Sequence, residues 1–271
     1  MGLLGLIIPM ETGEEGEESH WPPGVHSFDV KPLFPGAGMD WLNTYLLQAV
    51  IGAILVIVVW IWFAKDQKIV PTFKQWIGEQ LYNVVRNGIG RDALGPDYRK
   101  YTPYLVGLFS FILVNNLFGE FFLFMFPTFS RVGYAYALAL LSFILYNAAG
   151  ISKHGLGAYL KLMTMPKGVP GPLYLIIVPL EALSNFIVRP ITLALRLFAN
   201  MFAGHLVVLV FVVGGTMLLE QASWLYKIAG GASLVMAYPI FALEIFVGIL
   251  QAYIFTVLTA QYVASSLAED H

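Results

Sequence analysis

Long apolar segments constrain what this chain can fold into more than any other feature. They cover about residues 44–63, 104–126, 132–149, 173–219 and 224–267. A helix needs roughly 20 predominantly apolar residues to cross the ~30 Å hydrocarbon core of a bilayer, and each segment is about that long or longer. Only 12% of the 271 residues are charged, against roughly 25% in soluble domains. The sequence therefore predicts an all-α polytopic membrane protein with about five membrane-crossing helices.

The last two apolar segments are each too long for one upright crossing. At ~1.5 Å per residue, each exceeds the thickness of the hydrocarbon core more than twice. Each either folds into two shorter spans or forms one long helix that is tilted or bent. Candidate bend points are Pro179, Pro190, Gly214, Gly215 and Pro239. Residues 191–213 contain no proline and only one glycine, Gly204, which argues against an interior turn. We therefore expect two long, strongly tilted helices.

The remaining sequence consists of a tail and two polar links. Residues 1–41 are acidic and rich in proline and glycine, which predicts a mostly irregular tail, whereas residues 42–271 form a single membrane domain. In the first link, apolar side chains recur at helical spacing over about residues 72–90, with charged side chains on the other faces. This pattern is typical of an amphipathic helix, either at the membrane interface or packed on the cytoplasmic side.

The distribution of basic residues predicts the orientation. Ten of the fifteen Lys and Arg residues lie in the two links, seven in residues 65–100 and three in residues 152–171. Loops rich in basic residues remain in the cytoplasm, so we expect the N-terminal tail outside and the C-terminus inside. The first ten residues carry no basic side chain and do not resemble a cleaved leader. We therefore expect a multi-pass protein of the bacterial plasma (inner) membrane; the alternative is a protein encoded in an organelle, which would also lack a leader.

Composition excludes several classes of function. The net charge of −2 and the lack of a long basic run exclude a nucleic-acid partner. The chain has no cysteine, which excludes disulfides and thiolate metal sites, and we expect no metal or cofactor. A phosphate-binding loop of the GxxxxGK[ST] type is also absent, so the chain is not expected to be an enzyme on its own.

Several ionisable and amide side chains lie within the apolar segments. A charge at the bilayer centre costs between ~3 and more than 10 kcal/mol, so such residues face a protein interior or a wet cavity and usually serve transport. They are Asn116, Glu120, Glu181, Asn185, Arg189, Arg196, Asn200, His205, Glu244 and Gln251.

Arg196 is the candidate of greatest interest. At about 100° per residue, Asn200 and Thr192 lie within about 40° of it on one polar stripe. Arginine does not release its proton, so Arg196 can act only as a fixed positive charge. Its counter-charge is either Glu244, across helices, or a carboxylate of another protein. A carboxylate of another protein that moved past the arginine would be forced to release its proton, and one that turned away into lipid would have to take up a proton. Two separate wet entrances, with Arg196 between them, would then make ion flow drive rotation of the protein that carries the carboxylate.

Four residues are candidate linings of those entrances: Glu181, His205, Glu244 and Gln251. His205 lies about 180° from Arg196 and faces elsewhere. It could meet Glu244 as a carboxylate and imidazole pair able to pass protons near neutral pH, because the reference pKa of histidine is ~6.5. The alternative is that these polar side chains only hold helices together, with each hydrogen bond between helices contributing ~0.6 kcal/mol.

Residues 196–205, with the sequence RLFANMFAGH, closely resemble the signature of the a subunits of F-type ATP synthases. Further agreement comes from VNNLFGE around Asn116, from Glu181, from Arg189 followed by proline, and from QAYIFTVLT beginning at Gln251. The similarity extends over about residues 28–271.

This resemblance implies an Fo stator subunit with tilted final helices. Arg196 would face the carboxylates of the rotating c-ring, with Asn200 and Gln251 beside it and Asn116 near a half-channel. The partners would be the c-ring proteolipids, the peripheral stalk b subunits, the rest of the F1Fo complex and the lipid bilayer. Bacterial members often carry an acid in place of His205 and a histidine in place of Glu244, so these two residue types look exchanged.

Two other classes of function stay open at this point. A self-contained ion or solute transporter would use Arg196 to bind an anionic substrate, although no inverted repeat favours it. A structural subunit of another membrane complex would use the polar residues only as contacts between helices.

Overall fold

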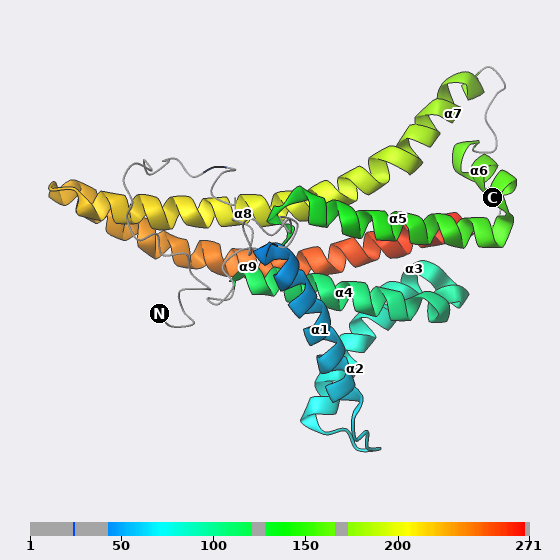
Figure 1. The fold of residues 1–271 in the computed structure, drawn as a ribbon, viewed down its shortest axis with the longest axis horizontal. Coiled ribbons are helices and arrows are strands. Elements are labelled where there is room, and N and C mark those ends of the chain that lie inside the picture. Colours follow the sequence, from blue (N-terminus) through cyan, green and yellow to red (C-terminus); the bar gives the residue numbers. More distant parts are fainter. Residues whose placement is uncertain (1–23, 25–42, 121–127, 166–172, 269–271) are drawn as a thin grey trace, which may run out of the picture.

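The computed structural model describes residue 24 and residues 43–120, 128–165 and 173–268, and the regular elements within these ranges are all helical (Figure 1). The acidic tail apart from residue 24, and the end of the second apolar segment, lie outside the described residues. Five helices within the described ranges are long and apolar enough to cross a membrane. They span Thr44–Ala64, Phe73–Glu120, Val132–His154, Tyr174–Glu220 and Trp224–Leu267. The prediction of an all-α polytopic membrane protein with five such helices is confirmed.

The first helix, α1 (Thr44–Ala64), closely matches the first predicted span. Its start is fixed by Asn43, whose side-chain oxygen accepts a hydrogen bond from the Leu46 backbone N–H at 2.9 Å. Such a cap satisfies one of the free N–H groups at a helix start. Many large apolar side chains of this helix, from Leu47 to Trp62, are exposed, as expected of a span that contacts lipid.

The predicted amphipathic helix is α2 (Phe73–Val85), capped by Thr72. It continues through a π-helical turn, η3 (Arg86–Arg91), and two short elements, α3 (Asp92–Leu94) and η4 (Gly95–Asp97), into α4 (Tyr98–Glu120). Val85 and Ile89 are buried against the other helices, whereas Phe73 is 77% exposed and Trp76 48% exposed. An apolar face turned away from the protein favours the interfacial alternative.

The next two spans, α4 and α5 (Val132–His154), follow each other along the chain, and each packs against α9 (Trp224–Leu267). The first, α4, begins six residues earlier than expected, at Tyr98 instead of Tyr104, and tolerates Pro103 in its first turns. A short turn, η5 (Thr128–Ser130), leads into α5 (Val132–His154), which also extends beyond the expected residue 149.

The second polar link contains a helix that its composition did not indicate, α6 (Leu156–Thr164). It is separated from α5 by Gly155, whose φ of 78° favours glycine.

Each of the last two apolar segments forms one continuous helical run, as predicted. The first consists of α7 (Tyr174–Leu183), a π-helical turn η7 (Ser184–Val188) and α8 (Arg189–Glu220). The second is α9 (Trp224–Leu267), which contains Pro239 without interruption. In Figure 1, α7 diverges from the line of α8 at η7. Pro190, the second residue of α8, lacks a backbone N–H, and such a residue commonly widens or bends a helix.

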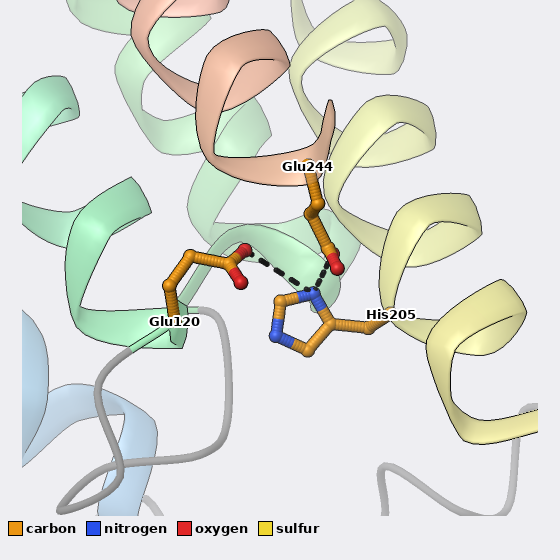
Figure 2. Close-up of side chains that lie close together, drawn as sticks. All are labelled: Glu120, His205 and Glu244. Atoms are coloured by element: carbon orange, nitrogen blue, oxygen red, sulfur yellow. Dashed lines mark ion pairs between the residues drawn. The ribbon is translucent and has the colours of Figure 1, made fainter. Parts of the chain in front are cut away.

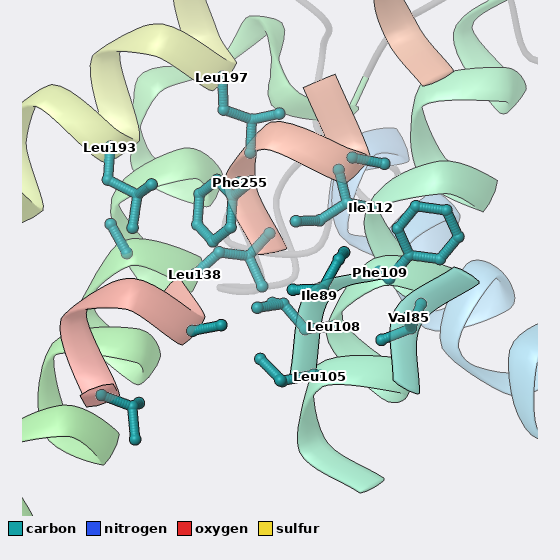
Figure 3. Packing of buried hydrophobic residues seen from close by; sticks show 14 of the residues in the cluster. Val85, Ile89, Leu105, Leu108, Phe109, Ile112, Leu138, Leu193, Leu197 and Phe255 are labelled. Atoms are coloured by element: carbon teal, nitrogen blue, oxygen red, sulfur yellow. The ribbon is translucent and has the colours of Figure 1, made fainter. Parts of the chain in front are cut away.

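The core lies where α4, α5, α8 and α9 meet, with the end of α2 and η3 against it. Figure 3 shows Leu105 and Ile112 of α4, Leu138 of α5, Leu193 and Leu197 of α8 and Phe255 of α9 converging there. Beyond this core α8 and α9 continue as an antiparallel pair, side by side along the longest dimension of the molecule (Figure 1). The core therefore holds the first part of α8 against α5 and α9.

Two glycines allow α8 and α9 to approach closely in their outer part. A Cβ atom added at Gly230 would lie 2.6 Å from the Gly215 carbonyl oxygen, and one added at Gly215 would lie 3.2 Å from the Gly230 carbonyl oxygen. Small residues at such crossings let backbones come together and gain packing energy that larger side chains prevent.

We predict that Gly230→Ala separates these helices and destabilises the protein by about 1–3 kcal/mol, because the new methyl group meets backbone rather than a mobile side chain. The neighbouring Gly231 has open space around its Cβ position and supplies the control. There, Gly231→Ala should be neutral or stabilising by up to ~1 kcal/mol. Thermal unfolding of the two variants in detergent measures the difference, and equal stabilities would contradict the close contact.

Candidate functional site

Arg196 and His205 leave opposite faces of α8, as their spacing predicts. Leu193, Ala194 and Leu197 are buried in the core, which leaves Arg196 on the exposed side of the helix. His205 lies on the side that faces α4 and α9. The core therefore directs the arginine out of the chain and the histidine into it.

Arg196 has no acidic partner within the described part of the chain. Neither a hydrogen bond nor an ion pair joins it to any of those residues. Glu244, the one candidate partner inside the chain, instead forms an ion pair with His205. Of the two alternatives left open by the sequence, pairing of Arg196 with Glu244 is thus contradicted.

His205 lies between two carboxylates contributed by two other helices (Figure 2). Its Nδ1 forms an ion pair with Glu244 Oε1 and lies 4.0 Å from Glu120 Oε1. The side chain of His205 is only 12% exposed, and those of Glu120 and Glu244 are each 5% exposed. Three ionisable groups from α4, α8 and α9 thus share one buried site.

The second ring nitrogen of His205 is held by the backbone. His205 Nε2 lies 3.1 Å from the carbonyl oxygen of Gly119, which can only accept a hydrogen bond. Nε2 therefore carries a proton, and Nδ1 is the atom that faces the carboxylates. A further proton can reside on Nδ1 or on a carboxylate, so the site can take up and release protons with little movement of its side chains.

Two residues beside the cluster shape it. A Cβ atom at Gly204 would lie 2.7 Å from Glu244 Oε1, so the glycine leaves room for the carboxylate next to His205. Asn116 lies one turn before Glu120 on α4 and donates a hydrogen bond to the Gly248 carbonyl oxygen at 2.8 Å. Gly248 lies one turn after Glu244, so this bond fixes α4 against α9 beside the cluster.

Asn200 and Gln251 form the second polar group. Asn200 Nδ2 donates to Gln251 Oε1 at 2.6 Å, joining α8 to α9 one turn beyond Arg196. A groove between these helices is lined by both Asn200 and Glu244. The groove thus borders one residue of the amide pair and one residue of the buried cluster.

Glu181 lies apart from the other predicted residues. It is half-buried on α7, and Asn185 Nδ2 donates to its Oε2 at 3.3 Å and to the Met163 carbonyl oxygen at 2.6 Å. The Tyr146 hydroxyl donates to the Asn185 carbonyl oxygen at 3.0 Å. The predicted residues thus fall into three places: Arg196 with the amide pair, the buried cluster with Asn116, and the Glu181 region.

Sequence reasoning did not assign Glu120 to the proton path, although it recognised an acid within an apolar segment. The available signal was its spacing, because Glu120 follows Asn116 by four residues and so shares its helix face. Arg189 differs from Arg196 in having contacts within the chain. It donates to Ser265 Oγ at 3.5 Å, and its guanidinium lies 5.2 Å from the centre of the Tyr262 ring.

Comparison with known proteins gives consistent matches over almost the whole chain. Residues 46–264 match the family described as ATP synthase A chain. A protein of Nocardioides sp. (strain ATCC BAA-499 / JS614) named ATP synthase subunit a is 45% identical over 261 residues, covering 92% of this chain and 94% of that protein. Proteins with the same name from Pseudarthrobacter chlorophenolicus, 40% identical with 99% of both chains covered, and Streptomyces lividans, 34% identical with 92% and 88% covered, also match.

We predict that Asn200 and Gln251 stabilise each other by about 0.6 kcal/mol and at most ~1.7 kcal/mol, the range measured for hydrogen bonds between membrane helices. A double-mutant cycle with Asn200→Ala and Gln251→Ala, followed by unfolding in mixed micelles, measures this coupling. Asn200→Ala combined with Asn185→Ala is the control, since those residues share no partner and their effects should add. Simple additivity of the first pair would show that the hydrogen bond contributes nothing.

Proposed function

The chain belongs to the ATP synthase A chain family, and from this we propose that it is the stator subunit of the Fo motor of a rotary ATP synthase. In this role it conducts protons to and from carboxylates on a ring of proteolipid subunits and thereby couples proton flow to rotation and ATP synthesis. Arg196 is the fixed charge, and two separate polar regions form the half-channels.

The observation that carries this proposal is the exposure of Arg196 on the surface of α8 without a partner among the described residues. A guanidinium facing hydrocarbon would cost several kcal/mol, so a membrane-embedded partner with a carboxylate is needed. Thr192, Ala199 and Ala203 share its exposed face and are small, which allows a neighbouring helix to approach closely.

A fixed arginine prevents protons from crossing directly between the half-channels. A ring carboxylate that comes next to Arg196 is favoured in its ionised form and must release its proton. Once it has passed and faces lipid, desolvation favours the protonated form, so it must take up a proton first. If the two proton routes reach opposite sides of Arg196, net flow is possible only when the ring turns.

The two routes are assigned to the two polar regions away from Arg196. One passes through Glu120, His205 and Glu244 and along the groove to Asn200 and Gln251, with Asn116 at its side. The separation of Glu181 from this cluster supports a second route along α7. Because His205 and both carboxylates can hold protons, we propose H+ rather than Na+ as the transported ion.

The partners and location follow from the same role. The chain would work only within the F1Fo complex, beside the c-ring and the peripheral stalk b subunits, in the bacterial plasma membrane. Its N-terminus would lie outside and its C-terminus in the cytoplasm. It has no catalytic activity of its own in this proposal. The outward-facing Arg196 argues against a self-contained transporter, which would hold a substrate-binding arginine inside the chain.

We predict that Arg196→Ala abolishes proton-driven ATP synthesis while the complex still assembles, because the fixed charge is lost and no buried contact is removed. Synthesis by inverted vesicles, with subunit content measured in parallel, tests this. Arg189→Lys is the matched control: it retains a positive charge on the same helix and should retain most of the activity. Full synthesis by Arg196→Ala would overturn the proposal.

Replacement of His205 should have a smaller effect. His205→Ala removes one proton-holding group but leaves Glu120 and Glu244, so we expect proton flux to fall by about 10²-fold or less, the lower end of what a positioned acid or base contributes. Passive proton conduction by vesicles stripped of F1 measures the flux. Normal flux in this variant would reduce His205 to a packing contact.

A further inference from the structure

The donor atoms of the buried cluster suit a metal ion as well as protons. Nδ1 of His205 and one carboxylate oxygen from each of Glu120 and Glu244 all lie within 4.8 Å of one another. We propose that these three side chains form a binding site for a divalent transition-metal ion of the Zn²⁺ class, and that a bound ion closes this proton route. The closing of the proton route rests on the proposed function, whereas metal binding does not.

The three donor atoms point into one site and are free to bind a ligand. Glu120 Oε1, His205 Nδ1 and Glu244 Oε1 are all buried and make no hydrogen bond within the described residues, apart from the ion pairing of the histidine with the two acids. Glu244 as a whole residue, backbone included, is only 6% exposed. Convergent buried donors of this kind are costly unless protons or a cation compensate them.

The spacing of the donors needs little adjustment. Donors about 2.0–2.1 Å from a tetrahedral ion lie roughly 3.4 Å apart. His205 Nδ1 is 4.0 Å from Glu120 Oε1 and closer to Glu244 Oε1. Small movements of both carboxylates, Glu120 toward the histidine and Glu244 away from it, would therefore give three of four tetrahedral positions, and water can occupy the fourth.

The hydrogen bond behind the histidine ring favours metal binding. A metal-bound histidine usually donates its other N–H to a carbonyl or carboxylate, which orients the ring and raises the basicity of the binding nitrogen. His205 Nε2 has such an acceptor in the Gly119 carbonyl oxygen at 3.1 Å. Because Gly119 directly precedes Glu120 in sequence, one segment of α4 both orients the histidine and supplies a donor.

The set of one imidazole and two carboxylates selects among ions. Imidazole nitrogen suits Zn²⁺, Co²⁺ and similar ions, whereas Mg²⁺ requires octahedral oxygen donors and retains its water. The donors lie on three helices packed around a common core (Figure 2). A bound ion would occupy the nitrogen and oxygen atoms that otherwise accept protons, and would therefore stop transfer through the cluster.

The test is titration of the purified full-length chain in detergent with Co²⁺, with excess Mg²⁺ present. Four-coordinate Co²⁺ absorbs visible light, so we expect an absorption band that saturates at one ion per chain and is displaced by Zn²⁺. His205→Gln, Glu120→Gln and Glu244→Gln should each weaken binding by at least about tenfold, since each removes a direct donor. His154→Gln, outside the cluster, should bind as the unchanged chain does.

The metal site would be overturned if the unchanged chain gave no saturable band, or if the three cluster variants bound Co²⁺ as tightly as the unchanged chain does. If a variant fails to fold, the titration of the unchanged chain still tests the metal site. A second measurement, Zn²⁺ inhibition of passive proton conduction in vesicles stripped of F1, tests closure of the route. If Zn²⁺ binds but does not inhibit proton conduction, the proposed closing of the proton route is overturned. If no metal binds but Arg196→Ala still abolishes ATP synthesis, the metal site is wrong and the proposed function stands.

Discussion

The cost of charge in hydrocarbon governs the arrangement of the long helices. Every ionisable side chain on α8 must reach a partner, water or another protein, because the bilayer supplies none of the solvation that water gives. His205 meets this requirement inside the chain, between the carboxylates of α4 and α9. Arg196 does not meet it within the described residues. One helix thus carries both an internally compensated site and an exposed charge without a partner among the described residues.

Close helix packing makes that division possible. The apolar face of α8 is buried against α5 and α9. Rotation of the helix about its axis would therefore expose Leu193 and Leu197 and at the same time bury Arg196. Glycines at the α8 and α9 contact let the two backbones approach, and Gly204 provides the space that Glu244 occupies. Packing of apolar and small residues therefore determines where the charged groups point.

Much of this could be predicted from local pattern. Segment length identified the five spans and the two long helices, since a helix must satisfy its own backbone across the hydrocarbon core. Helical spacing also separated Arg196 from His205, because both lie on one helix of regular geometry. Prediction was weakest at element ends and in the second link, where α4 and α5 extend into polar sequence and α6 forms. There, tertiary contacts rather than apolar length decide the helix.

The sequence by itself determined the fold class, the long helices and the helix faces of Arg196 and His205, since all of these follow from the geometry of a single helix. Only the tertiary structure decided which acid each base meets. Glu120, His205 and Glu244 come from three helices distant in sequence, and their meeting depends on how α4, α8 and α9 pack around a common core. Periodicity along one helix contains no information about the rotation and depth of its neighbours, and these decide which side chains touch.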